Sequence, residues 1–489
     1  MSVLRKYFDA AVSSAITKAI VASSSIMVLF LLNAILGKAG FGTFMLALTI
    51  MRIFGLITSS GFSQLMLFRV SREAHSGPNG KTARRMLGNS LVYALLLSVL
   101  VAMVTLLMRN EVGRVASNPA LADWLLAAGL IIPADVLRYV VASWYRALQR
   151  IRVAVLVRDG VPAMLLPVLL AAVWLTDGKA FTPELAGLVY GASALLPALA
   201  LLIMHPPLLF LHRGIFSRWD VFYGAKMSLT QLAAQPARQI DIVLVGFLAS
   251  AGVTAEYVLA SRLAQILMMS KSFLAQLLVP RIGYRLGRSE VIELVAEYNA
   301  VRYVSLCFAI LAGMIYVAFP LQIMDLFGEY TQGAVLIALV AAMLVRVGVG
   351  PSGNYLAQAG YAGWTLWSTI SGFVSNVLLA VWWIPEHGAM GAAMAFFVAV
   401  LIQNAISVGA VWYFDRFPAL NAGTGLVLLT VTTLLLGNAG GYIDGLVAVF
   451  GMTVVLMITA SSNWKDLLAV WRKYRANFAI NLGCASKPK

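Results

Sequence analysis

The residues of this sequence that could do chemistry are charges that interrupt long hydrophobic stretches. Six are cations and three are carboxylates, at Arg52, Arg138, Arg238, Arg262, Lys271, Arg346, Asp135, Asp241 and Glu256. A charge at the centre of a bilayer costs about 2.5–3.5 kcal/mol on insertion scales. Each charge therefore predicts a hydrated cavity, an ionic partner or a ligand. The surplus of cations favours an anionic solute.

Arginine indicates the kind of anion, because its planar guanidinium binds phosphate through two parallel hydrogen bonds. Arg52, Arg262 and Arg346 have no acidic residue within one helical turn of the sequence. We therefore predict that these three bind the substrate, with ionic partners on other helices as the alternative. Lys271 is a further candidate, with the alternative that its long stem extends to the cytoplasmic interface.

Two pairs of opposite charge have the spacing of helical neighbours. Asp135 and Arg138 lie three residues apart, and Arg238 and Asp241 repeat the arrangement in reverse, so each pair shares a helix face. Their cations are candidate substrate ligands, and salt bridges that hold a helix bundle together are the alternative. The carboxylates of Asp135, Asp241 and Glu256 are candidates for coupling transport to protons or a cation. Glu256 lies near the outer end of its span, where hydration alone is the alternative.

Other kinds of site are not indicated. The four histidines fall in predicted loops, which gives neither a metal cluster nor a buried Ser-His pair. The run from His75 to Thr82 resembles a phosphate-binding loop but lacks its first glycine and any preceding strand. Two cysteines are too few for a disulfide framework. We expect no metal, no cofactor, no nucleic-acid partner and no enzymatic activity.

The elements that must position these charges are membrane spans. The 489 residues are 61% hydrophobic and 11% charged, with a mean hydropathy of +0.86, whereas soluble domains average about 25% charged residues. The pattern predicts an all-α polytopic membrane protein with about 14 transmembrane helices. They lie at approximately residues 15–36, 43–67, 86–108, 121–145, 153–175, 185–204, 227–248, 255–279, 301–320, 333–356, 364–384, 389–413, 421–437 and 441–460.

Lysine and arginine gather in alternate loops, which predicts the orientation of the chain. Cations are frequent around residues 69–85, 146–158, 213–226 and 281–302, and scarce in the intervening loops, where Lys38 is one of few. By the positive-inside rule both termini are cytoplasmic. Tryptophans near span ends, among them Trp144, predict an aromatic belt.

The two halves of the chain resemble each other. Ala39-Gly40 matches Ala251-Gly252, and Arg69 matches Arg281, at a constant spacing. This predicts two six-helix lobes related as parallel repeats, with the solute site between them and two extra C-terminal helices. The predicted divisions are an N-terminal interfacial helix (1–14), an N-lobe (15–204), a cytoplasmic linker (205–226), a C-lobe (227–413), spans 13 and 14 (421–460) and a basic cytoplasmic tail (461–489).

The segment from Asn33 to Phe44 is similar to the glycine-rich turn between the first two spans of a known transporter family, and the next helix ends near Gly61-Phe-Ser-Gln64. With the span number and the cationic interior, the chain resembles the polysaccharide-transport branch, the Wzx-type lipid-linked oligosaccharide flippases, of the multidrug/oligosaccharidyl-lipid/polysaccharide (MOP) exporter superfamily. The resemblance implies a bacterial inner-membrane flippase that moves undecaprenyl-pyrophosphate-linked oligosaccharide units outward by alternating access. The units would serve O-antigen, capsule or exopolysaccharide synthesis.

The resemblance also implies where the substrate binds and which partners to expect. Cations in the central cavity would face the pyrophosphate and acidic sugars, with Arg52 and Arg262 as the best candidates and Arg346 as a further one. Membrane lipids are expected partners, and polysaccharide polymerase or chain-length machinery are candidate partners. We expect a monomer.

Three other functions remain open from the sequence. A cation-coupled multidrug exporter of the same superfamily usually has a carboxylate in span 1, where this chain has Lys18 and Asn33. A lipid II-type flippase is closer in architecture. A polysaccharide polymerase or ligase generally needs a large outward loop, and the largest predicted here covers only about residues 109–120.

Overall fold

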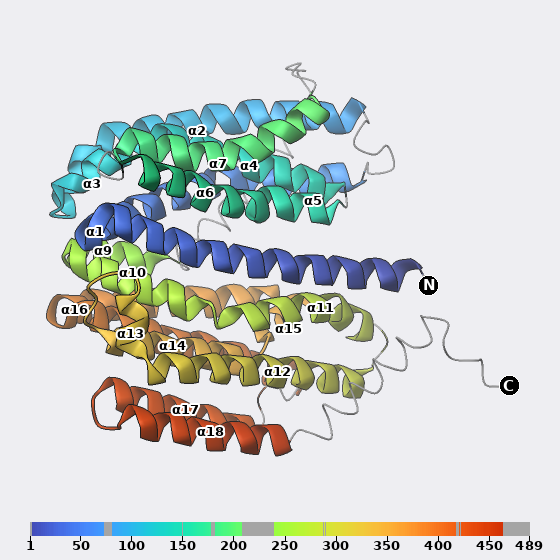
Figure 1. Cartoon of the computed structure of the whole chain (residues 1–489). Helices are drawn as coiled ribbons and strands as arrows, with labels where there is room; N and C mark the ends of the chain where they lie inside the picture. The colour runs from blue at the N-terminus through green and yellow to red at the C-terminus, as the bar shows by residue number, and fades with distance from the viewer. Residues whose placement is uncertain are drawn as a thin grey trace. The chain divides into compact units, whose positions relative to one another are not determined.

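The computed structural model describes residues 2–72, 81–148, 150–177, 181–207, 239–286, 288, 290–416, 420 and 422–462. Within these ranges every regular element is a helix (Figure 1). Eight of these helices are long and apolar enough to cross a membrane, and one bent helix pair makes a further candidate. The chain therefore has the all-α, polytopic membrane fold that its hydrophobic pattern predicts.

The chain divides into two compact units, each of which is described by itself. The N-unit comprises Ser13–Leu259 and Leu326–Glu329, and the C-unit comprises Met1–Val12, Ala260–Asp325 and Tyr330–Lys489. The change of unit at Leu259 falls inside a helix that the sequence places in span 8.

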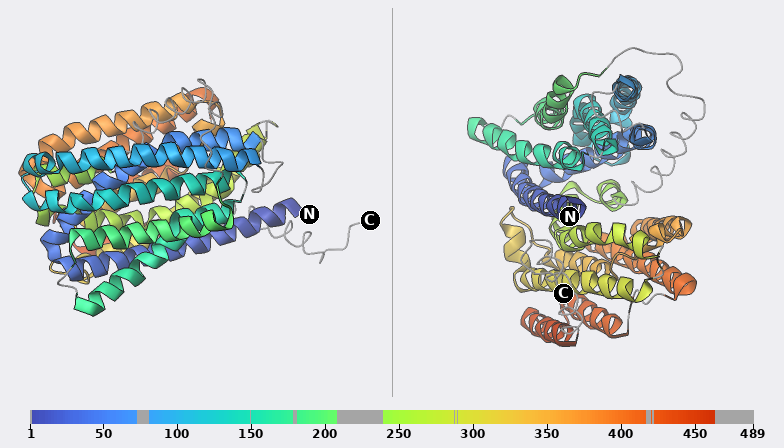
Figure 2. Two further views of the ribbon diagram at one scale, coloured as in Figure 1. Left: turned by 90° about the horizontal axis from the view of Figure 1, so that it is seen from above. Right: turned by 90° about the vertical axis from the view of Figure 1, so that its right-hand side faces the viewer.

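The N-unit is a helix bundle in which α4 packs against both α2 and α7 (Figures 1 and 2). Its helices are α1 (Ser2–Arg72), α2 (Lys81–Val115), α3 (Pro119–Trp124), the 3-10 turn η2 (Leu125–Ala127), α4 (Ala128–Ala147), α5 (Ile151–Val155), the π-helical turn η3 (Leu156–Gly160), α6 (Val161–Asp177), α7 (Pro183–Met204), α9 (Ile240–Leu248) and the first part of α10 (Ala251–Gln265).

The C-unit is built around α14, which packs against α12, α16 and α17. In the span formed by α14 and α15, 89% of the most apolar 18-residue stretch is buried inside the protein. This span is therefore the centre of the C-unit. Its helices are the rest of α10, α11 (Met268–Leu286), α12 (Val291–Ala318), α13 (Pro320–Asp325), α14 (Gly333–Gly348), α15 (Ser352–Gln358), α16 (Ala362–Asp415), α17 (Ala422–Ala439) and α18 (Gly445–Ser462).

Two of the longest helices each contain a glycine at which the chain reverses. Gly37 in α1 has φ of 67° and Gly388 in α16 has φ of 54°, a left-handed region that side chains with a Cβ rarely adopt. α1 therefore comprises the two predicted spans 15–36 and 43–67, and α16 comprises 364–384 and 389–413. Residues 2–14, predicted as an interfacial helix, are helical and continuous with the span that follows.

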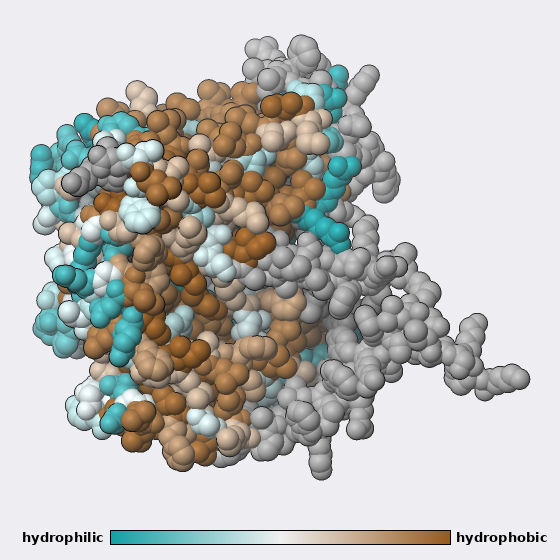
Figure 3. Space-filling model, in the orientation of Figure 1, coloured by the Kyte–Doolittle hydropathy of each residue, from teal (hydrophilic) through white to brown (hydrophobic). Residues whose placement is uncertain are grey.

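Hydrophobic side chains cover the helix flanks on the face of the molecule shown in Figure 3, and hydrophilic side chains gather where helices end. Leu107, Leu175, Ile203 and Phe450 are each more than 70% exposed. Leucine and isoleucine at such exposures are expected in contact with lipid rather than water. The surface thus agrees with a multi-pass membrane protein.

Two residues lie differently from their predicted places. Trp144 is fully buried in the N-unit core and its indole donates a hydrogen bond to the Ala83 carbonyl at 3.1 Å, so it does not belong to an interfacial aromatic belt. Arg302, counted with the cytoplasmic loop cations, lies inside α12 and is also fully buried, with its guanidinium 4.9 Å from the Tyr303 ring. Both predictions were wrong because the distance of a residue from the end of a span does not show whether its side chain faces the core.

Candidate functional site

Arg52 lies on the second half of α1 and is half-buried. Three residues further on, Gly55 packs so closely on α4 that an added Cβ would lie 3.4 Å from the Cβ of Asp135. Residues three apart share a helix face, so the Arg52 face of α1 is the one that meets α4. Among the residues that the structure describes, Arg52 forms neither a hydrogen bond nor an ion pair. It is therefore a half-buried cation inside a span.

Asp135 and Arg138 of α4 form the ion pair that their spacing suggested. Arg138 Nη2 lies 2.5 Å from Asp135 Oδ1, and the two side chains are 12% and 8% exposed. Arg138 Nη1 also donates to the Arg158 carbonyl at 2.9 Å, which is part of η3, a π-helical turn inside the fifth predicted span. The partners found for Arg138 support the structural alternative for this pair over a free substrate ligand.

Glu256 is buried and paired, although it lies near the start of α10. Lys38 Nζ lies 2.5 Å from Glu256 Oε1 and also donates to the Glu329 carbonyl at 3.3 Å. Lys38 directly follows the chain reversal at Gly37, so the turn of α1 fixes its position. The sequence showed Lys38 only as a rare cation of an outer loop, and nothing in the linear pattern named its partner.

The helices that carry Lys38 and Glu256 approach each other at backbone distance. An added Cβ at Gly42 would lie 2.0 Å from the Ala251 carbonyl oxygen and 2.8 Å from the Ala255 nitrogen. Only glycine fits such a contact. Ala251 belongs to the segment that matches Ala39-Gly40 in the predicted repeat, so two segments paired by sequence similarity pack together within the N-unit.

Asp241 lies in the first turn of α9 and is buried. The Tyr257 hydroxyl donates a hydrogen bond to Asp241 Oδ2 at 2.7 Å. Arg238, the predicted partner of Asp241 and a candidate substrate ligand, lies outside the described residues. The Arg238–Asp241 pair therefore stays a prediction.

Arg262 and Arg346 lie in the C-unit, and the contacts of both include neutral glutamine amides. Arg262 Nη1 lies 3.5 Å from Gln265 Oε1. Arg346, in the last turn of α14, donates from Nη2 to Gln403 Oε1 of α16 at 3.2 Å and lies 6.0 Å from the Phe396 ring. Both guanidinium groups thus lie inside the C-unit among polar side chains of α10 and α16.

The Lys271 side chain bonds to the backbone of another helix, a role that the sequence did not indicate. Its Nζ donates to the Arg346 carbonyl at 2.6 Å. That carbonyl has lost its usual helical partner, because Gly350 takes a φ of 75° and its N–H bonds to Val347 instead. A lysine that bonds the last carbonyls of a helix also interacts favourably with the helix dipole. Lys271 thus caps α14 and fixes the backbone of Arg346.

A second break lies beside Lys271, between α10 and α11, which meet at 43°. Two side chains of the C-unit bond to the backbone at this break: the Tyr316 hydroxyl donates to the Leu263 carbonyl at 3.1 Å, and Ser270 Oγ donates to the Leu267 carbonyl at 3.2 Å. The hydrophobic pattern predicts one unbroken span over residues 255–279, so the bend was not expected from the sequence.

The described part of the chain contains no group of three or more His, Cys, Asp and Glu side chains that could hold a metal ion. The cations Arg52 in the N-unit, and Arg262 and Arg346 in the C-unit, lie inside helices. That they bind the substrate stays a prediction.

The chain was compared with known protein families, curated proteins and solved structures. Residues 10–284, more than half of the chain, match the family described as polysaccharide biosynthesis protein. The chain belongs to this family. The family resemblance read from residues 33–64 lies inside the matched region and is confirmed. No curated protein matches the chain.

The similarity to solved structures shows the fold of the chain. The chain is similar to the lipid II flippase MurJ in an inward closed conformation, with a TM-score of 0.68 and 14% identity over 93% of this chain and 99% of that one. It is also similar to an inward-facing multidrug resistance MATE family transporter of the MOP superfamily, with a TM-score of 0.60 and 17% identity over 81% of this chain and 95% of that one. The chain is similar as well to VcmN, a MATE transporter from Vibrio cholerae, with a TM-score of 0.60 and 14% identity over 85% of this chain and 98% of that one. The fold is that of MOP transporters.

Proposed function

We propose that this protein is a flippase that moves undecaprenyl-pyrophosphate-linked oligosaccharide units from the cytoplasmic to the outer leaflet of a bacterial inner membrane. The units would serve O-antigen, capsule or exopolysaccharide synthesis. Membership of the polysaccharide biosynthesis protein family and the MOP transporter fold support a flippase with a lipid-linked substrate. The observation that carries the proposal is Arg52, a half-buried guanidinium in a span with no ion pair among the described residues.

Arg52, Arg262 and Arg346 are the proposed ligands of the pyrophosphate and of acidic sugars. Their side chains are half-buried, and the contacts of Arg262 and Arg346 include the amides of Gln265 and Gln403. Charge-assisted hydrogen bonds from a guanidinium to phosphate are roughly twice as strong as neutral ones. Arg138 and Lys271 are given structural roles instead, because Arg138 forms an ion pair with Asp135 and Lys271 caps α14.

Asp135, Asp241 and Glu256 are the proposed residues for coupling transport to protons or a cation. Asp135 and Glu256 are each paired with a cation, so a proton or cation would have to compete with Arg138 or Lys38. Asp241 accepts a hydrogen bond from the Tyr257 hydroxyl. Replacing the carboxylate that couples transport with its amide should abolish any dependence of transport on an ion gradient.

Transport can be tested with the purified protein in sealed vesicles. Labelled undecaprenyl-pyrophosphate-linked oligosaccharide is added to one leaflet, and a membrane-impermeant glycosidase then reports how much has reached the other. Translocation with unchanged product mass supports the flippase, whereas growth of the glycan chain supports a polymerase and transfer to an acceptor supports a ligase. Translocation of lipid II alone would favour the lipid II-type alternative, which the MurJ-like fold keeps open. Export of cationic drugs alone would favour the multidrug alternative.

The orientation and partners belong to the same proposal. Both termini are proposed to be cytoplasmic, with the basic tail from residue 461 held at the anionic leaflet. A cysteine introduced at the exposed Arg114 of a variant without Cys307 and Cys484 should then react with an impermeant maleimide from outside the cell. Polysaccharide polymerase and chain-length machinery are the proposed partners, and the protein is proposed to act as a monomer.

A further inference from the structure

The π-helical turn η3 carries two charged side chains that the proposed function does not use. Arg158 and Asp159 are 51% and 45% exposed, and Arg158 Nε lies 3.4 Å from Asp159 Oδ2. In the sequence Arg158 counts with the cations of a cytoplasmic loop. The structure instead places it inside a helical stretch, Arg152–Thr176, that is long and apolar enough to cross a membrane. η3 therefore presents an exposed acid–base pair within a span.

A hydrogen bond from α4 places η3 at the level of the buried Asp135–Arg138 ion pair. Arg138 Nη1 donates to the Arg158 carbonyl at 2.9 Å, while Nη2 bonds to Asp135. Arg138 lies nine residues before the end of α4 at Ala147, which corresponds to about 14 Å of helix. The turn thus lies well inside the N-unit bundle and away from the end of α4.

Exposed charges at this position indicate contact with water. Charged side chains within spans almost always face the interior of the bundle or a water-filled cavity, because hydrocarbon does not solvate them. π-helical turns inside α-helices also occur frequently at functional sites. The exposed Arg158 and Asp159 therefore indicate a hydrated surface at η3.

The proposed pyrophosphate ligand of the N-unit lies near this surface. The Tyr139 hydroxyl of α4 interacts electrostatically with Arg52 and Asp159, as well as with Asp135 and Arg138. The Tyr139 ring lies 4.8 Å from Arg138 Cζ. Arg52 of α1 and Asp159 of η3 are therefore both close to one tyrosine of α4.

A carboxylate beside a guanidinium suits hydroxyl groups. A hydroxyl can donate to the Asp159 carboxylate and can accept from the Arg158 guanidinium. Hydrogen bonds to charged groups are also stronger than those between neutral groups. A phosphate or an acidic sugar would be repelled by Asp159. The pair therefore suits an uncharged sugar, which carries several hydroxyls.

We propose that Arg158 and Asp159 bind the hydroxyl groups of an uncharged sugar of the lipid-linked glycan while Arg52 contacts the pyrophosphate. The inference rests on the proposed function and adds to it the residues that distinguish a glycan-bearing lipid from undecaprenyl pyrophosphate alone. Arg138 is a positioning residue, because it holds the backbone of η3 through the Arg158 carbonyl.

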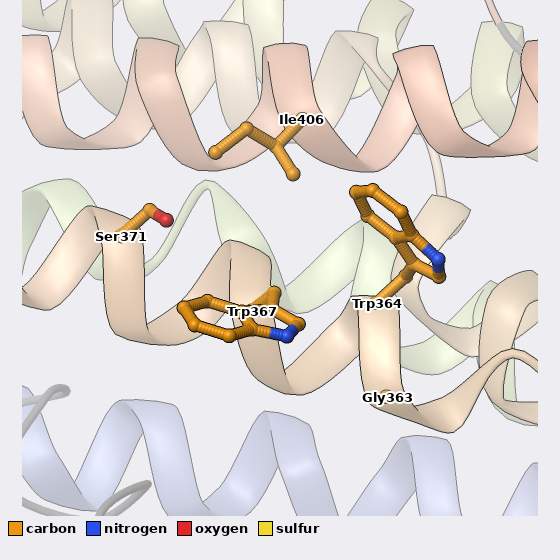
Figure 4. A pocket seen from close by; sticks show the side chains of 5 residues that line it. All are labelled: Gly363, Trp364, Trp367, Ser371 and Ile406. Carbon is orange, nitrogen blue, oxygen red and sulfur yellow. The ribbon is translucent and has the colours of Figure 1, made fainter.

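A depression on α16 of the C-unit offers different chemistry. Figure 4 shows its lining residues, which are Gly363, Trp364, Trp367, Ser371 and Ile406. None of these lining residues carries a charge, and Ser371 supplies their one hydroxyl. A ligand rich in hydroxyls would find its charged partners at η3 and not in this depression.

The probes are lipid-linked oligosaccharide isolated from cells that produce the protein, and undecaprenyl pyrophosphate, which lacks the glycan. Binding of each lipid to the full-length protein in detergent is measured by calorimetry. Asp159→Asn and Arg158→Gln should each weaken binding of the glycan-bearing lipid about tenfold, because each removes a hydrogen bond to a charged group. Both variants should bind undecaprenyl pyrophosphate as the unaltered protein does, whereas Arg52→Ala should weaken the binding of both lipids.

Two control variants should leave the binding of both lipids unchanged. Glu111→Gln is the matched control, because Glu111 is 51% exposed and also pairs with an arginine, Arg114, at 2.7 Å. Ser371→Ala removes the hydroxyl of the depression on α16. Thermal unfolding in detergent, followed for every variant, shows that each one is folded.

Unchanged binding of the glycan-bearing lipid by either η3 variant would overturn the assignment. An equal loss for both lipids would also overturn it, because the pair would then act on the pyrophosphate end. Tighter binding after Asp159→Asn would mean that the carboxylate faces an anionic group, which is equally incompatible with it. In each of these cases a loss of both lipids by Arg52→Ala would leave the proposed function standing. If the unaltered protein binds neither lipid, the proposed function itself fails.

Discussion

Replacing Arg52 with alanine should weaken substrate binding without destabilising the protein. Arg52 forms no ion pair among the described residues, so its removal leaves no buried carboxylate unpaired. A hydrogen bond to a charged group contributes about 1.5–3 kcal/mol, which corresponds to a roughly 10- to 150-fold loss at about 1.4 kcal/mol per decade. Arg52→Lys should give an intermediate loss, because it keeps the charge and loses the two-pronged geometry.

The assay measures the initial rate of translocation in sealed vesicles at substrate concentrations well below saturation. Thermal unfolding in detergent is followed in parallel to show that the variant is folded. Arg114→Ala is the matched control, because Arg114 is 75% exposed and pairs only across one turn with Glu111. It should retain the full rate.

The reasoning about Arg52 has a clear point of failure. A normal rate for Arg52→Ala would show that the cation does not contact the substrate. A lowered rate accompanied by a much lower unfolding temperature would assign Arg52 a structural role. Either result would remove the observation on which the proposed function depends.

Three further predictions concern stability. Arg138→Ala leaves Asp135 buried without its cation and should lower the free energy of unfolding by about 3–5 kcal/mol; a loss under 1 kcal/mol in chemical denaturation would contradict the assigned ion pair. Gly42→Ala should lower the unfolding temperature because its Cβ meets the Ala251 carbonyl at 2.0 Å, whereas Gly252→Ala, with its nearest neighbour at 4.0 Å, should not; equal unfolding temperatures would refute the close approach. Lys271→Met should cost about 1–3 kcal/mol through the uncapped Arg346 carbonyl; normal stability with weakened pyrophosphate binding would instead make Lys271 a substrate ligand.

The Lys38–Glu256 pair can be tested by exchanging its two charges. Lys38→Glu should destabilise the protein by placing two carboxylates together, and adding Glu256→Lys should restore much of the lost unfolding free energy. If the free energy of unfolding of the double variant is no higher than that of Lys38→Glu alone, the pair does not stabilise the protein.

Much of the fold could be predicted because its causes are local in the sequence. Hydrophobic runs of sufficient length indicated the spans, and the reversals at Gly37 and Gly388 fall between predicted spans. The pairing of Asp135 with Arg138 followed from their separation of three residues on one helix. These features depend on helical periodicity and on backbone conformation, which neighbouring residues determine.

The remaining features could not be predicted, because they depend on contacts between distant segments. Lys38 and Glu256 are 218 residues apart, and no spacing rule connects them. At the bend between α10 and α11, the Leu263 carbonyl accepts a hydrogen bond from Tyr316 of another helix, a contact that the sequence does not indicate. Likewise the capping role of Lys271 requires knowing that Gly350 redirects its N–H. A buried lysine is equally compatible with ligand binding and with helix capping until its partner is known.

The π-helical turn η3 has a consequence for how the sequence tolerates change. A π-helical turn is equivalent to one extra residue inserted into an α-helix, and each residue of an α-helix turns the chain by about 100°. Deleting one residue between Leu156 and Gly160 would give a regular helix of ordinary stability. It would also rotate the Arg158 carbonyl away from Arg138. A one-residue deletion there should thus be tolerated by the helix while leaving Arg138 with Asp135 but without the Arg158 carbonyl as a second acceptor.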